Sequence, residues 1–139
     1  MMLALLLAAA TPIAIDAAAR AGLPAATATL TAHGKTSSCT GVRLSDLVAR
    51  AGLPTGEAVR GQALVTVIVA EATDGYRVVF SLGEIDAKLG NAAIIVADRC
   101  DGRPLAAADG PLRLVVPGEA RAARSVRALA RLQAVVAAP

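Results

Sequence analysis

Two apolar runs separated by an Asp-Gly pair place the strongest constraint on how this chain folds. Residues 63–70 form a β-branched apolar run, and residues 76–80 follow it after Asp74-Gly75. An Asp-Gly pair between two such runs is typical of a β-hairpin, because these residues suit a tight turn between strands. The sequence therefore predicts an antiparallel strand pair, which argues against a purely parallel, doubly wound sheet.

Short strands and short helices are expected along the rest of the chain. Thr at every second position of residues 27–32 predicts a strand, which His33-Gly34 then turns. Leu44, Leu47, Val48 and Ala51 recur at helical spacing before Gly52, so residues 44–51 are predicted to form a helix. Three further elements are a short helix that Ser81 and Glu84 cap, a buried strand at 92–97 and a strand at 112–116. Together they predict a single α+β domain with a mixed sheet and short helices.

The amino-acid composition narrows the range of functions that the chain can have. The chain has 139 residues, of which 55% are hydrophobic and 18% charged, so it is long enough for one core and does not resemble a disordered polymer. Tyr76 and Phe80 are its only aromatic residues, and it has no Trp. Modules that bind single-stranded nucleic acid need several exposed aromatic rings, so we expect no nucleic-acid partner.

The net charge of +3 is concentrated in the last stretch of the chain. Residues 111–139 carry Arg113, Arg121, Arg124, Arg127 and Arg131 against Glu119 alone. This clustering indicates a local anion site rather than a nucleic-acid footprint. A solvated arginine face on a C-terminal helix is the structural alternative.

Residues 1–10 form a short, uncharged apolar run that ends in small residues. This pattern is typical of a secretory signal peptide cleaved near Thr11, which would leave residues 11–139 as the domain in the periplasm or outside the cell. The run is too short to span a bilayer, and we expect no transmembrane segment. No basic residue precedes the run, so a cytosolic chain with an apolar N-terminus is the alternative.

The two cysteines, Cys39 and Cys100, allow one intramolecular pairing. They fit no zinc signature, since a zinc site needs three or four ligands and His33 is the only histidine. In an oxidising compartment they could form a disulfide, whereas two buried small hydrophobic residues are the alternative.

Five segments, in order and over roughly residues 27–135, resemble the molybdopterin-binding domain of the sulfite oxidase family. They are Gly41–Leu47, Asp74–Leu82, Asp101–Leu105, Gly110–Pro117 and Arg124–Arg127. Short exported proteins that carry only this domain look most similar. The resemblance implies a mixed α/β fold that encloses a single-pterin molybdenum cofactor, and enzymes that move an oxygen atom to or from substrates such as sulfite or sulfoxides.

The resemblance also implies site residues. Family enzymes hold molybdenum with a Cys thiolate in the loop before the Gly-x-x-Leu segment, but residues 33–38 contain no thiol, and Cys39 stands out of register. No metal ligand and no catalytic residue are therefore assigned. Arg127 stands at the position of a family lysine that reaches the pterin and its phosphate, and Arg124 precedes it by three residues.

Helical spacing would let Arg124 and Arg127 converge on one anion. His33, at a strand end, is a third candidate cofactor contact, although a turn residue is the plainer interpretation. Asp98 and Asp101 are carboxylates that could pair with the two arginines instead.

Two functions follow from these residues and from the resemblance. The first is a molybdopterin-dependent oxidoreductase that transfers oxygen atoms. The second is a degenerate, non-catalytic domain of the same fold that binds an anionic small molecule, such as a pterin cofactor, or a protein partner. The sequence leaves open whether the protein is an enzyme.

Overall fold

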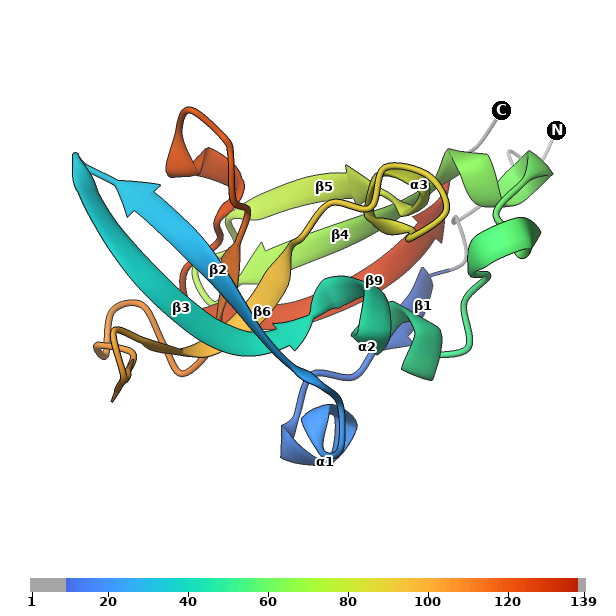
Figure 1. Ribbon diagram of the computed structural model, residues 1–139. Helices are drawn as coiled ribbons and strands as arrows, with labels where there is room; N and C mark the ends of the chain where they lie inside the picture. The colour runs from blue at the N-terminus through green and yellow to red at the C-terminus, as the bar shows by residue number, and fades with distance from the viewer. Residues whose placement is uncertain (1–9, 138–139) are drawn as a thin grey trace, which may run out of the picture.

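The computed structural model, which describes residues 10–137, contains two β-sheets (Figure 1). Both sheets contribute to a main apolar core, and a smaller apolar cluster lies on the second sheet. The first sheet has the strand order β1 (Ala10–Ile13), β9 (Leu129–Val136), β4 (Thr66–Ala72), β5 (Arg77–Ser81). The second has the order β2 (Ala25–Ala32), β3 (Lys35–Arg43), β6 (Ile95–Cys100), β7 (Arg103–Pro104), and β8 (Arg113–Val115) also pairs with β6.

The helices are short and connect the strands. They are α1 (Ala17–Arg20), α2 (Leu44–Arg50) and α3 (Leu82–Ile85), with 3-10 turns η1 (Gly56–Ala58), η2 (Gly61–Val65) and η3 (Ala122–Arg124). The α+β class is confirmed. In place of one mixed sheet, the described residues form two sheets whose strand pairs are all antiparallel.

The Asp-Gly hairpin forms as predicted. β4 and β5 pair antiparallel from Val67 with Ser81 to Glu71 with Arg77. At the turn, the Asp74 carboxylate accepts a hydrogen bond of 3.0 Å from the Tyr76 amide. The predicted capping box of α3 is also confirmed, because the Ser81 hydroxyl and the Glu84 carboxylate each accept a hydrogen bond from the other residue's amide.

A second hairpin, β2–β3, turns at His33-Gly34 as expected. Both residues have a positive φ, 52° and 73°, which is the geometry of a tight two-residue turn between strands. The polar residues 35–38, expected from the sequence to lie in a loop, instead begin β3. They are stable as a strand because each of them pairs with a residue of β2, from Lys35 with Ala32 to Ser38 with Thr29.

β3 and β6 approach each other closely at Gly41. A Cβ on this residue would overlap the Val96 carbonyl oxygen and lie 2.7 Å from the Ala97 Cα. The register between the two strands also shifts between Thr40 and Gly41. Glycine is therefore required here for the strands to pair.

The predicted leader, residues 1–10, lies outside the described residues except for Ala10, which begins β1. Within residues 10–137, no helix combines the length and apolar character needed to cross a membrane.

Candidate functional site

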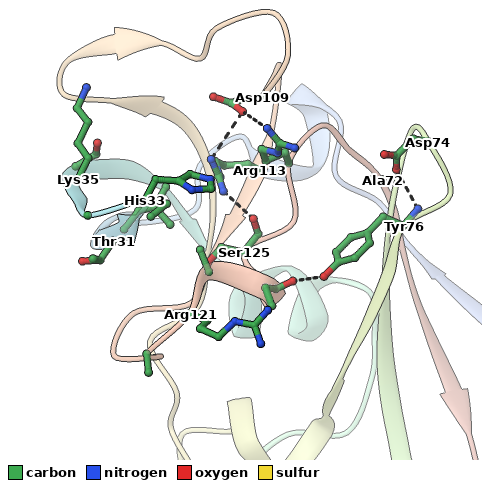
Figure 2. A pocket seen from close by; sticks show the side chains of 18 residues that line it. Thr31, His33, Lys35, Ala72, Asp74, Tyr76, Asp109, Arg113, Arg121 and Ser125 are labelled. Atoms are coloured by element: carbon green, nitrogen blue, oxygen red, sulfur yellow. Dashed lines mark hydrogen bonds and ion pairs between the residues drawn. The ribbon is translucent and has the colours of Figure 1, made fainter.

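A cleft of about 780 Å³ lies where the tip of the β2–β3 hairpin meets the β4–β5 turn and the segment 109–127 (Figure 2). Most of its charged lining is positive. The cations are Lys35, Arg113, Arg121 and Arg127, beside the imidazole of His33, and the carboxylates are Asp74 and Asp109. Such a charge balance favours an anionic ligand.

Arg113 is the most buried of these cations. It is the first residue of β8, and its side chain is 9% exposed. One Nη donates a 2.8 Å hydrogen bond to the Ser125 carbonyl, and the other lies 4.0 Å from Asp109 Oδ1. The Nε is buried and has no hydrogen-bond partner among the described residues. Burial lowers the pKa of Arg113, and the negative charge of Asp109 opposes that shift.

Arg127 reaches the same carboxylate from the solvent side. Its Nη1 lies 3.8 Å from Asp109 Oδ1, and its side chain is 66% exposed. His33 is exposed at the tip of the β2–β3 hairpin and lines the same cleft. Two of the three residues predicted from the sequence, His33 and Arg127, are therefore brought together.

Arg124 is not one of the residues that line the cleft. Its guanidinium donates to Glu119 at 2.8 Å and to Glu84 at 3.2 Å, and it lies 4.7 Å from the centre of the Phe80 ring. A further bond of 3.1 Å goes to the Val79 carbonyl. Hydrogen bonding to Glu119, followed by Glu84, raises the pKa of Arg124. These contacts fasten η3 to the β4–β5 hairpin.

The C-terminal arginines are not on a helix, which corrects the expected helical spacing. Arg124 ends the 3-10 turn η3, Ala128 has a positive φ of 48°, and β9 follows as a strand paired on both sides. Pairing with β1 and β4 satisfies the backbone of β9, so no helix is needed.

The alternative partners Asp98 and Asp101 are engaged elsewhere. Asp98 lies 3.5 Å from Arg20, and the Asp101 carboxylate accepts a hydrogen bond of 2.9 Å from the Ser38 amide. Arg124 and Arg127 do pair with carboxylates, as that alternative expected, but with other ones.

Cys39 and Cys100 form a disulfide between directly paired positions of β3 and β6. Of the two interpretations of the cysteines, a disulfide or two separate buried hydrophobic residues, the structure has the disulfide. Because the chain has only these two cysteines, the folded protein offers no free thiol. Among the described residues, no three His, Cys, Asp or Glu side chains gather closely enough to hold a metal ion. The described residues therefore do not supply the free thiolate that would hold molybdenum.

Sequence reasoning counted Arg113 only as one of five arginines in the basic stretch, and it missed Asp109 as a site residue. Arg113 carried a usable signal, since a charged residue between Leu112 and Leu114 in a buried strand needs a specific partner. Asp109 had no local signal, because its role depends on arginines that lie later in the chain.

The fold and the cleft define an α+β domain with a cleft whose charged lining is mostly positive. A sequence model of the family described as "Oxidoreductase molybdopterin binding domain" matches residues 18–138, and the chain belongs to that family. The resemblance seen in the sequence is thereby confirmed. No curated protein shows a significant match to the chain.

Proposed function

We propose that this domain binds a phosphate-bearing anionic small molecule, a pterin cofactor or a close relative, in the cleft lined by His33, Arg113 and Arg127. One observation carries the proposal. Arg113 is a cation nine-tenths buried in the wall of a cleft whose charged lining is mostly positive. The carboxylate that it approaches, Asp109, is 4.0 Å away, so an anion in the cleft would supply the negative charge that a buried cation favours.

Phosphate suits this site for chemical reasons. A guanidinium donates parallel hydrogen bonds that match the oxygens of a phosphate, and such charge-assisted bonds are stronger than neutral ones. Lys35 and Arg121 add positive charge around the site.

Oxygen-atom transfer is the function that the resemblance to sulfite oxidases implies but that these residues do not favour. Molybdenum would supply the two-electron chemistry, and the family fixes it with a cysteine thiolate. Here the disulfide occupies both cysteines. We therefore favour binding without catalysis. Metal and pterin analysis of protein from a cofactor-competent host tests this choice: bound molybdenum that is lost in Cys39→Ser would contradict it.

We further propose that the protein is exported to the periplasm or secreted, with residues 1–10 as a cleaved leader. The disulfide supports this location, because disulfides persist in oxidising compartments. The intact mass of the exported protein should correspond to a chain that begins at Thr11, and a full-length product would contradict the proposal.

The binding proposal is tested with two matched arginine variants. Arg127 and Arg131 have similarly exposed side chains, 66% and 64%, and each pairs with one carboxylate, but only Arg127 lines the cleft. In calorimetric titrations with pyrophosphate, Arg127→Ala should weaken binding by about tenfold to a hundredfold, as expected for a charge-assisted hydrogen bond. Arg131→Ala should bind like wild type. Equal affinities in all three proteins would refute the proposal.

A further inference from the structure

A single carboxylate oxygen lies between the two arginines of the cleft. Asp109 lies beside Arg113 (Figure 2), with its Oδ1 4.0 Å from the Arg113 Nη1. The same Oδ1 is 3.8 Å from the Arg127 Nη1. Both distances allow electrostatic attraction, but both are too long for hydrogen bonds. The carboxylate is therefore near the cations without saturating their donors.

The backbone holds Asp109 in this position. Its carbonyl accepts a hydrogen bond of 2.8 Å from the Ala128 amide, and its own amide donates one of 2.9 Å to the Ala106 carbonyl. The side chain is 33% exposed, so an anion that enters between the arginines meets a carboxylate that is anchored beside them.

An anchored carboxylate changes which anions can bind. A ligand oxygen that carries no proton is repelled by it, whereas a ligand that presents an O–H or N–H donor beside its negative charge can donate a hydrogen bond to it. Inorganic phosphate retains at least one proton near pH 7, because its third proton is lost only in strongly alkaline solution. A phosphate monoester, whose second pKa is about 6, is mostly without a phosphate proton at pH 7 and needs a neighbouring hydroxyl or amino group as the donor. Sulfate has the same shape as inorganic phosphate but no proton.

We propose that Asp109 is the specificity-determining residue of the cleft, and that it selects anions that carry a hydrogen-bond donor, such as protonated phosphate or an organic phosphate with a neighbouring hydroxyl or amino group. This inference rests on the proposed function, since it assumes that anions bind at Arg113 and Arg127. It adds the chemical class of ligand that the site accepts.

Asp74 provides a matched control. It is the other carboxylate of the cleft, but it accepts its hydrogen bond from the Tyr76 amide and forms no ion pair with an arginine among the described residues. Asp74→Asn should therefore leave the choice between anions unchanged. Asp109→Asn keeps the size of the side chain and removes the negative charge.

The experiment measures the affinities of phosphate, sulfate and glycerol phosphate for wild type, Asp109→Asn and Asp74→Asn at pH 7 by calorimetry. Wild type and Asp74→Asn should prefer phosphate to sulfate by roughly tenfold to a hundredfold, the range for a hydrogen bond to a charged group. Asp109→Asn should bind sulfate more tightly and lose most of this preference. Tighter binding of glycerol phosphate than of phosphate would identify an organic phosphate as the ligand, and the reverse would identify free phosphate.

The outcomes separate this inference from the proposed function. A wild type that binds phosphate and sulfate equally overturns the role of Asp109 and leaves anion binding intact, and this result needs no variant to be stable. A preference for phosphate that persists in Asp109→Asn also overturns it. Sulfate binding that appears only in Asp109→Asn supports it. If no protein binds any of the three anions, the inference and the proposed function both fail.

Discussion

Removal of the Cys39–Cys100 disulfide should lower the free energy of unfolding by about 4 kcal/mol. The bond joins residues that are 61 positions apart. The chain-entropy relation for a closed loop of this length gives about 14 cal/mol/K, or about 4 kcal/mol at 25 °C. With an unfolding entropy near 2.1 cal/mol/K per residue, the same loss lowers the Tm of this domain by about 14 °C.

The assay is urea unfolding of wild type, with and without reductant, beside the double variant Cys39→Ala/Cys100→Ala. Alanine suits the comparison because Cys39 is fully buried among apolar residues. Reductant should shift wild type to the midpoint of the double variant and should not change the double variant itself. If the oxidised wild type and the double variant differ by less than about 1 kcal/mol, the disulfide does not stabilise the fold in the way that the loop-closure argument requires.

Two other predictions follow from contacts outside the cleft. Gly41→Ala should destabilise the domain by about 3 kcal/mol or more, because the new Cβ overlaps the Val96 carbonyl and only a backbone shift relieves the overlap; a loss below about 1 kcal/mol in urea unfolding would contradict the close approach of the strands. Arg124 holds the pKa of Glu119 below its ordinary 4.5, so this pair contributes stability above that pH and loses it as the pH falls through the lower folded value. Glu119→Gln should accordingly flatten the acid decline in Tm below pH 4.5, and an acid profile identical to that of wild type would count against the pair.

Elements with a local signal could be predicted from the sequence. The Asp-Gly turn, the capping box at Ser81 and the helical spacing of residues 44–51 all describe interactions within a few residues, and β4–β5, α3 and α2 form at those places. β3 and β9 were not predicted, because their polar or arginine-spaced sequences become strands only through partners far along the chain.

The candidate site could be predicted only in part, for the same reason. His33 was named from its place at a strand end and Arg127 from its match to a basic position of the family, and both line the cleft. Arg124 lies outside it, because Glu84 and Glu119 hold its guanidinium. The contacts of Arg113 with Asp109 and Ser125 depend on how the segments before and after β8 lie against it. No periodicity in the sequence predicts that arrangement.

Different segments form the arginine side of the cleft and the stretch in which family enzymes carry the thiolate for molybdenum. Arg113, Arg127 and Asp109 lie on β8 and the segments beside it, whereas that stretch is here a two-residue turn and the start of β3. Cys39 lies further along β3, and its bond to β6 stabilises the second sheet. A change in the turn would alter His33 and Lys35, which also line the cleft, but not the arginines. If the protein binds its ligand without molybdenum, as proposed, the covalent link between β3 and β6 adds the kind of stability that a cofactor adds by binding only the folded state.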